Sequence, residues 1–566
     1  MSPSVVNGDL MVSFDGRIDD RNDLLAELSL SWQASDAAIV AAAYRRWDDD
    51  FLRHLDGDFV LALWEPARQR LLLARDCFGL QPLYYHRTPE AIVWSSHLAA
   101  LVGEVGCDRT PDSQFVAGFL SYGSRGDVSP YAAIASVPPA GVLCATRGNE
   151  SVRTYWNLDP TREIRMASDL DYEERFFELF RNSVRNRLAA RGPVFCELSG
   201  GVDSSAILAV ADGIHRAEGL PIERLQTVSQ IYDETAGMDD RPFITLVEEA
   251  FGRPRHHVHE KDLPLFSSIG DDYPFDEPSP AWSGTGLFMA INERMAAHHS
   301  TVILSGMGGD DLCWSQIMNP PGVADELARF RFGRAIRESR RWAPALAKPR
   351  AAILLDAVRS LFARADAKVM PWIDRRFARS SGMDRPGSDD AEVRAIRQPS
   401  RRMQFMMLRC LAVEMGFRHC VSPEIDVRYP FVDRRLIDFV FAIPIDQHLR
   451  PGETRSLQRR AMARVLPHEI AYRQSKGGPG ASIYRRFRQR WPAIKALFDQ
   501  PRVCDYGYVD RAALAEALQR AAHSQNLNAP GLLRLVALES WLRTLERPSV
   551  AADPRDRKTA IVSGRR

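Results

Sequence analysis

The sequence lacks the features that mark several common classes of protein. No apolar run approaches the length of a membrane span, and the 566-residue chain carries a net charge of only +1. Proteins that bind nucleic acid or a membrane surface usually show a strong basic excess, so neither partner is expected. The eight cysteines include no CxxC pair, which argues against a zinc site or a disulfide frame. They are typical of reduced thiols, and with no visible signal peptide we expect a cytoplasmic location.

Two changes of pattern along the chain predict its domain organisation. In residues 1–157, short apolar runs alternate with turn residues, which is typical of a sheet-rich domain. Over 170–548 strand and helix patterns alternate, which predicts a parallel sheet with helices on its faces. A mostly helical, arginine-rich stretch occupies about 315–420, and the tail 549–566 is predicted to be disordered. The predicted fold class is therefore α/β, with an α+β domain at the N-terminus.

The segment SGGVDSS (199–205) carries the clearest chemistry. It lies between a buried strand and a helix, so its glycines form a turn whose unpaired N–H groups suit a phosphate. The serines add hydroxyl donors, and Asp203 could hold Mg²⁺. The segment is neither a Walker A loop, which needs GxxxxGK[ST], nor a nucleophile elbow, because Glu197 stands where GxSxG needs glycine. An ordinary tight turn with a helix cap is the alternative interpretation.

A second glycine-rich segment, SGMGGDD (305–311), follows the apolar run TVIL. It is interpreted as a loop leaving the end of a buried strand, with Asp310 and Asp311 behind three glycines. A thioether, Met307, occupies the middle of this loop.

These segments resemble motifs of the asparagine synthetase family, whose synthetase domains are PP-loop ATP pyrophosphatases. SGGVDSS and SGMGGDD are followed, in the family's order, by EIDVRYPFVDRRLIDFVFAIP (424–444) and YRQSKGG (472–478). The N-terminal half resembles the family's glutaminase domain, for instance in DGRIDDRNDLLAEL and LDGDFVLALWEPARQRLLLARDCFGLQPLYY. The resemblance implies a degenerate Ntn-type glutaminase-like sandwich, followed by a PP-loop parallel-sheet synthetase domain with a helical extension.

The resemblance also implies a role for individual residues, with ATP and Mg²⁺ as cofactors. Asp203 and Asp310 correspond to the magnesium-binding aspartates, and Asp311 is expected to cap or orient its loop. Lys476 corresponds to the lysine that stabilises the acyl-adenylate and the transition state of amide formation, since a compact ammonium suits an oxyanion or a phosphate. Asp310 is implied to be catalytic as well. The residues implied in binding ATP and its pyrophosphate are Ser199, Gly200, Gly201, Asp203, Ser204, Ser205 and Gly306, with Val228 and Ser229 lining the adenine pocket.

The glutaminase half departs from the family's pattern. Working members carry a cysteine as residue 2, whose thiol attacks glutamine, whereas this sequence has Ser2 followed by Pro3. Cys77 has no α-amine to replace it and is expected to be a packed thiol. We therefore expect a degenerate domain whose first strands are missing, with nitrogen supplied as a substrate amine or as free ammonia. A start codon assigned too far downstream would give the same pattern.

Met307 is the second departure. It stands where asparagine synthetases have glutamate and β-lactam synthetases have tyrosine, and a thioether cannot deprotonate an amine. Met307 is expected to line an apolar substrate pocket, which suits a peptide better than free aspartate. These departures are most similar to lasso peptide cyclases (lasso macrolactam synthetases), which adenylate an Asp or Glu side chain of a precursor peptide. The peptide's N-terminal amine then closes a ring, releasing AMP and pyrophosphate. The implied partners are that precursor peptide and a leader peptidase.

Other interpretations stay open. The chain could be an asparagine synthetase or a β-lactam-synthetase-like ligase that uses free ammonia or an internal amine, or an inert scaffold protein. The basic clusters at 329–342 and 484–491 are interpreted as solvated helix faces, although arginines near a cleft could bind carboxylates or phosphates. For the alternating histidines of RHHVHE (255–260), packing is favoured over metal binding.

Overall fold

The fold is described from a computed structural model that covers most of the chain. The residues outside the described part are 1–3, 7–8, 105–106, 122–125, 234–239, 264–268, 280–284, 316–319, 363–368, 384–392, 394, 417–424, 475–486, 523–527, 547–559 and 564–566. Among the described helices, none is both long enough and apolar enough to cross a membrane.

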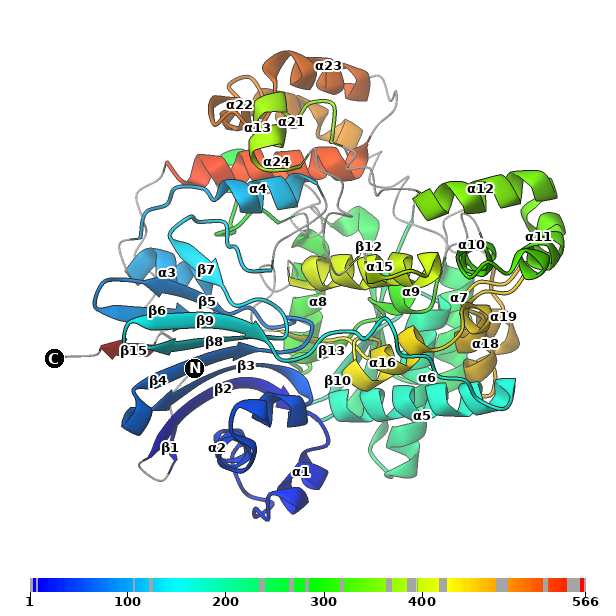
Figure 1. The fold of residues 1–566 in the computed structure, drawn as a ribbon, viewed down its shortest axis with the longest axis horizontal. Helices are drawn as coiled ribbons and strands as arrows, with labels where there is room; N and C mark the ends of the chain where they lie inside the picture. Colours follow the sequence, from blue (N-terminus) through cyan, green and yellow to red (C-terminus); the bar gives the residue numbers. More distant parts are fainter. Residues whose placement is uncertain are drawn as a thin grey trace.

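The N-terminal domain is a sandwich of two antiparallel sheets (Figure 1). The first sheet has the order β1-β2-β3-β4-β8-β9, with β1 Ser4–Val6, β2 Leu10–Ile18, β3 Gly57–Glu65, β4 Arg70–Arg75, β8 Gly141–Thr146 and β9 Asn149–Thr154. The second has the order β15-β6-β5-β7, with β15 Ala560–Ser563, β6 Ala91–Ser95, β5 Tyr84–Arg87 and β7 Ile134–Ser136. Alternate residues of both sheets, such as Leu73 and Trp94, share one core between them.

Helices cover both outer faces of this sandwich. Helices α1 (Arg21–Glu27) and α2 (Asp36–Trp47) pack on the first sheet. Helices α3 (Leu98–Glu104) and α4 (Ser113–Leu120) lie on the side of the second sheet. The α+β architecture with a glutaminase-like sandwich agrees with the sequence prediction.

The disorder prediction for 549–566 is wrong for four residues. Ala560–Ser563 forms β15, which pairs antiparallel with β6. The three consecutive apolar residues Ala560, Ile561 and Val562 suit a strand at the edge of a sheet. The prediction of disorder was based on the polar residues that make up most of the rest of the tail.

The second domain contains a five-stranded sheet in the order β12-β11-β10-β13-β14, and all its neighbouring strands are parallel. The strands are β12 Arg255–His259, β11 Leu225–Ile231, β10 Val194–Glu197, β13 Val302–Leu304 and β14 Asp426–Arg428. Helices α5 (Asp169–Arg187), α6 (Val202–Ala217) and α7 (Arg241–Phe251) contribute to the core on one face, and α8 (Thr285–Ala297) covers the other. The strand order reverses between β10 and β13, which makes a switch point where their C-terminal loops meet.

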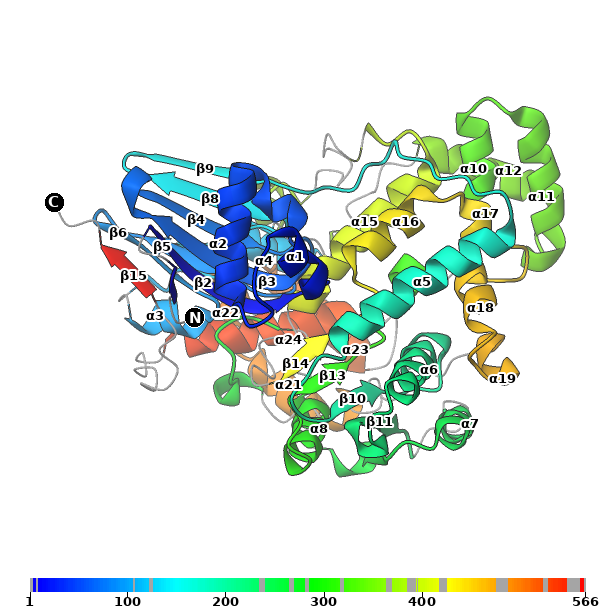
Figure 2. The ribbon, with the colours of Figure 1, turned by 90° about the horizontal axis from the view of Figure 1, so that it is seen from below.

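The remaining chain is helical (Figure 2). Its elements are α9 Gly309–Leu312, α10 Pro321–Ala328, α11 Phe332–Leu346, α12 Arg350–Phe362, α13 Arg375–Ser380, α15 Pro399–Gly416, α16 Arg434–Ala442, α17 Ile445–His448, α18 Ser456–Met462, α19 His468–Ala471, α21 Trp491–Leu497, α22 Arg502–Asp505, α23 Arg511–Ala522 and α24 Ala529–Thr544. The predicted helical extension is therefore present, and it continues to the end of the second domain.

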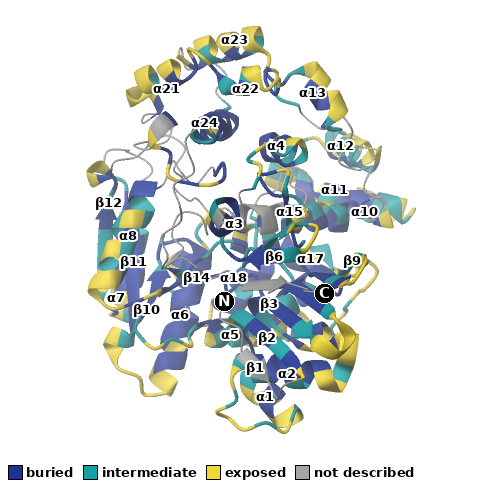
Figure 3. Cartoon of the chain, turned by 90° about the vertical axis from the view of Figure 1, so that its left-hand side faces the viewer, coloured by how far each residue is buried: buried dark blue, intermediate teal, exposed yellow. Residues whose placement is uncertain are grey.

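Helix α24 joins the two domains through an apolar core. Every residue from 531 to 542 is buried (Figure 3). Helix α4 packs below α24 in the view of Figure 1, and α21 to α23 pack above it. Trp541 packs edge-on against Tyr131 with ring centroids 5.6 Å apart, and its indole Nε1 donates to the carbonyl of Asp276 at 2.8 Å. Arg534 donates to the carbonyl of Phe119 in α4. This helix, some 410 residues after α4, is thus part of the N-terminal domain's own packing.

A buried charge cluster forms a second junction between the domains. The Arg187 guanidinium of α5 lies 3.5 Å from the Asp58 carboxylate of β3 and 3.4 Å from that of Asp433 before α16. Arg17 of β2 pairs with Asp58 at 2.6 Å. Because each charge has an opposite partner, the cluster is tolerated in the interior, but removal of one member would leave a buried charge uncompensated.

We expect Trp541→Ala to destabilise the protein by about 3–5 kcal/mol, because it removes a fully buried aromatic side chain and leaves a cavity between the domains. Urea unfolding followed by fluorescence and by circular dichroism measures the loss. Tyr506→Ala, at an exposed side chain of the same helical layer, serves as the control. A loss below about 1 kcal/mol at Trp541 would show that α24 does not join the domains energetically.

Candidate active site

The loop after β10 places a helix N-terminus at the switch point. Gly200 has φ +65° and sits so close to α7 that a Cβ would lie 2.8 Å from Cβ of Phe243. Only glycine fits this turn, which releases the chain into α6 at Val202. The N-cap residue of α6 is Gly201, which has no side chain to accept hydrogen bonds from the N–H groups of the first turn. These N–H groups and the positive end of the helix dipole are therefore available to an anion.

Two serines of this loop, Ser199 and Ser204, hydrogen-bond to each other. The Ser204 hydroxyl accepts the Ser199 backbone N–H at 3.1 Å and lies 3.1 Å from the Ser199 hydroxyl. The Ser205 hydroxyl is buried and has no hydrogen-bond partner among the described residues. The structure thus brings the Ser199 and Ser204 hydroxyls together beside the head of α6, and their contact with a phosphate stays a prediction.

The loop after β13 packs directly on the first one. A Cβ on Gly306 would lie 3.2 Å from the Ser204 backbone nitrogen, and a Cβ on Gly309 only 2.6 Å from Asp203 Oδ1. Gly308 has φ +91° and starts the short helix α9, from which Asp310 projects. The glycines of SGMGGDD thus allow the closest approach between the loops.

Asp203 and Asp310 meet at one guanidinium group. Arg455 Nη2 lies 3.0 Å from Asp203 Oδ2 and also pairs with the carboxylate of Asp310. Gln458, in the first turn of α18, donates to Asp203 Oδ1 at 2.9 Å. The Asp203 side chain is 8% exposed and that of Asp310 is 55% exposed, so one carboxylate is fixed in the wall and the other faces the opening.

A pocket of about 220 Å³ opens in front of these groups. Its described lining residues are Gly201, Val202, Asp203, Asp310, Ser315, Thr454, Arg455, Arg459, Arg473 and Gln474. Three guanidinium groups and a helix N-terminus give it the polarity that a polyphosphate requires. The sequence predicted the two aspartates and the glycine loop of this pocket, but it did not predict the three arginines.

Arg459 and Arg473 hold the walls of the pocket together. Arg459 donates to the carbonyls of Thr454, Ala471 and Arg473, which links the segment before α18 to the end of α19. Arg473 donates to the Gly200 carbonyl at 2.9 Å, pairs with Asp240, and stacks 3.7 Å above the Phe243 ring. Burial lowers the pKa of the Arg459 guanidinium, and the neighbouring Arg455 adds to this effect.

The chemistry of this donor set fits Mg²⁺ with a nucleotide. Two carboxylates converge on one cationic group, as they would on a divalent cation, and carboxylate oxygen is a ligand that Mg²⁺ prefers. Groups of three or more potential metal-ligating side chains are absent from the described residues, so phosphate oxygens and water would complete the shell. Asp203 and Asp310 would hold the ion, which when bound would neutralise charge on the leaving pyrophosphate.

The structure does not test the roles of the other predicted residues. Val228 and Ser229 are 3% and 1% exposed within β11 and are not among the residues lining this pocket, so their adenine contact stays a prediction. Met307 packs, partly buried, against the core below the sheet, and its predicted substrate contact likewise stays untested. Lys476, Ser2 and Pro3 lie outside the described residues.

Cys77 has the environment of a structural thiol. It packs against the core of the first sheet, and its sulfur lies 3.8 Å from the Tyr155 hydroxyl. Burial raises the pKa of Cys77 to about 12, so the thiol is neutral at pH 7 and is a poor nucleophile.

Comparisons with known proteins decide the family. The asparagine synthase family model matches residues 175–543, and a glutamine amidotransferase domain model matches residues 3–156. The chain belongs to the asparagine synthase family. It is accordingly an ATP-dependent carbon–nitrogen ligase that releases AMP.

Two of the similar proteins match nearly the whole of this chain, and a third matches about half of it. "Asparagine synthetase [glutamine-hydrolyzing] 3" of Bacillus subtilis is 23% identical over 94% of this chain and 86% of its own. "Amidase chyE" of Penicillium rubens is 24% identical over 95% of this chain and 85% of its own. "Amidase chry2" of Gibberella zeae is 28% identical over 49% of this chain and 42% of its own.

We expect Gly309→Ala to reduce ATP-dependent AMP release by about 100-fold or more, because the added Cβ would lie 2.6 Å from Asp203 Oδ1 and displace the carboxylate. Gly213→Ala is the matched control, since that glycine also lies in a helix and has open space around it. AMP is measured by chromatography, alongside a melting curve of each variant. Unchanged AMP release in Gly309→Ala would show that contact between the loops is dispensable.

Acid is expected to weaken the fold behind this pocket. His448 is buried beside Gln458 and lies 3.0 Å from the Val440 carbonyl through Nε2, and burial lowers its pKa to about 4. Because this value lies below the ordinary 6.5, the stability it contributes is complete above pH 6.5 and is lost as the pH falls toward 4. Between pH 7 and pH 5 the loss should be about 2 kcal/mol.

Urea unfolding at both pH values tests this expectation. His448→Gln removes the titrating group, so its stability should fall less between pH 7 and pH 5 than that of the wild type. His54→Gln, at an exposed position, should behave like the wild type. An equal fall in His448→Gln would assign the acid sensitivity to other groups.

Proposed function

We propose that this member of the asparagine synthase family is a macrolactam synthetase of the lasso peptide cyclase type. It activates an Asp or Glu side chain of a precursor peptide as an acyl-adenylate, and the N-terminal amine of the same peptide closes the ring. The observation that carries the proposal is the loop after β13, which brings Asp310 to the pocket but offers a thioether, Met307, in place of an ionisable side chain. A reaction whose amine is already held beside the activated carboxyl depends least on a base at that position.

The chain's own residues would supply binding and orientation. The N–H groups at the head of α6 and the Arg455 guanidinium would hold the anionic phosphates, and Arg473 would keep the glycine loop in place. Nitrogen would come from the peptide, with no step in the N-terminal domain. The partners in this proposal are the precursor peptide and a leader peptidase that exposes its amine.

A second candidate is an asparagine-synthetase-like ligase that joins ammonia to a small carboxylic acid. The match to the Bacillus subtilis asparagine synthetase over 94% of this chain favours it. An inert scaffold is disfavoured, since the described part of the pocket keeps both aspartates and the glycine loop assembled.

Intact mass spectrometry distinguishes these functions. A precursor peptide encoded beside the gene, with its leader removed, is incubated with the protein and Mg·ATP. We expect loss of one water from the peptide, reduced by about 100-fold or more in Asp203→Asn and Asp310→Asn. Asp50→Asn, an exposed carboxylate of the N-terminal domain, is the control and should retain full activity.

Two other results would each assign the protein to one of the alternative functions. An unchanged peptide mass, together with AMP release that depends on aspartate and ammonium, would assign the protein to asparagine formation. No AMP release with either substrate would support the scaffold.

A further inference from the structure

Exposed apolar side chains gather on one part of the molecule. Among the described residues, fifteen large apolar side chains are exposed, and six of them fall between residues 330 and 362: Phe330, Phe332, Ile336, Leu355, Val358 and Phe362. We call residues 321–362, which form α10, α11 and α12, the arm. It projects from the synthetase domain on the side opposite the N-terminal domain (Figure 1). Apolar patches of this kind mark interaction sites on soluble proteins.

Helix α12 is apolar on two faces. Its inner face packs into the arm through Ile353 and Ala357, which are 1% and 4% exposed. Its outer face presents Leu355, Val358 and Phe362, which are 50%, 41% and 80% exposed. These three lie at positions i, i+3 and i+7, which is the spacing of one stripe on a helix. An apolar stripe on the outer side of a helix is typical of a helix that packs against another helix or sheet.

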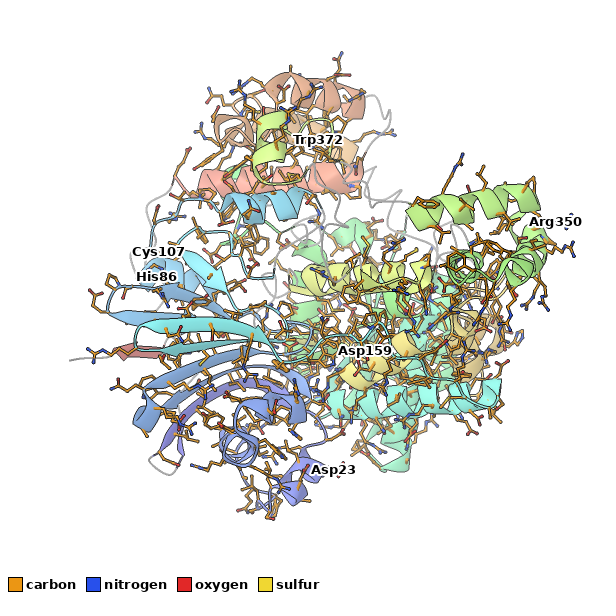
Figure 4. All side chains as sticks on the ribbon, in the orientation of Figure 1. Asp23, His86, Cys107, Asp159, Arg350 and Trp372 are labelled. Carbon is orange, nitrogen blue, oxygen red and sulfur yellow. The ribbon has the colours of Figure 1, made fainter. Side chains whose placement is uncertain are left out.

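The arm is also the basic part of a nearly neutral protein. It contains nine Lys and Arg against four Asp and Glu, a net charge of +5, whereas the whole chain carries +1. Arg334, Arg337 and Arg340 of α11 have no acidic partner within ion-pair distance in the described part of the chain. Arg350, at the start of α12, lies at the outer end of the arm (Figure 4). A surface of this charge attracts an acidic partner.

The arm begins at the active site. Trp314 of the body packs into its core with Val323 and Trp342, and the Trp314 carbonyl accepts the backbone N–H of Arg455 at 3.2 Å. The next residue, Ser315, lines the pocket. The base of the arm therefore adjoins this pocket.

We propose that the outer face of α12, with the arginines of α11, is the docking surface for an acidic amphipathic helix of a partner polypeptide. A stripe of three side chains matches the seam of one partner helix, whereas membrane binding uses a broad apolar face. A second copy of the chain is disfavoured, since two basic faces repel each other. The inference does not depend on the macrolactam function and applies to any amide synthetase on this scaffold.

Fluorescence anisotropy of labelled synthetic peptides tests the proposal with the full chain. The probe is a three-heptad peptide with leucine at the a and d positions and glutamate at the others. Its control has the same composition with the leucines spread around the helix. We expect the probe alone to bind, and its affinity to fall as salt is added, because charge complementarity contributes.

Variants then locate the binding face. Leu355→Asp with Val358→Asp should weaken probe binding by about tenfold or more, and so should Arg334→Glu with Arg337→Glu. Leu170→Asp, at an exposed leucine of α5 on the main body, is the matched control and should bind normally. All variants should release AMP as the wild type does, which shows that the pocket is intact.

Four results would overturn the proposal. Equal binding of the two peptides, or full binding by Leu355→Asp with Val358→Asp, would show that α12 is not the docking face. Sedimentation with phosphatidylcholine–phosphatidylserine vesicles that is lost in the same variant would assign the face to a membrane. A dimer in sedimentation velocity that dissociates in that variant would assign it to a second copy of the chain.

Discussion

Contact between two glycine-rich loops is the constraint on which the active site depends. The sheet order places β10 beside β13, so the loops leaving their C-terminal ends must share a narrow space. Gly309 leaves no room for a Cβ against Asp203, and Gly200 leaves none against α7. Because these glycines let the two loops touch, Asp203 and Asp310 both reach the same guanidinium nitrogen of Arg455. Two carboxylates this close to one nitrogen atom would repel each other, and the positive charge of Arg455 offsets that repulsion.

The sequence alone was sufficient for the parts of this site that are local. Glycines, serines and aspartates in short segments after apolar strands predicted the turn, the head of α6 and the two carboxylates, and the structure brings these together. The arginines could not be found in the same way. The chain contains 74 basic residues, of which six are lysine, so a lysine such as Lys476 is conspicuous whereas Arg455 and Arg473 are not. Their importance comes from long-range contacts with Asp203, Asp310 and Gly200, which no local pattern encodes.

The same limit applies to the fold. Alternating strand and helix patterns predicted the parallel sheet, since each element has its own period. Helix α24 gives no comparable signal of its position, because it is buried on all sides and its sequence shows no face. Its partner α4 lies more than 400 residues earlier, and β15 likewise pairs with β6 across most of the chain. Contacts between elements so far apart in the sequence depend on how the surfaces of the folded elements fit together, and local sequence patterns do not encode that fit.

These contacts also explain why an N-terminal domain is retained whether or not it hydrolyses glutamine. The apolar core around α24 is built from both domains, so removal of the first domain would expose Trp541 and the face of α24 that α4 covers. The charge cluster adds to this dependence, since Arg187 would lose Asp58 and Asp19 together. Because α5 carries Arg187 and packs against α18, a disturbance at this junction would reach the helix that carries Gln458 and follows Arg455. The domain therefore supports the geometry of the synthetase pocket through packing alone, with no chemistry of its own required.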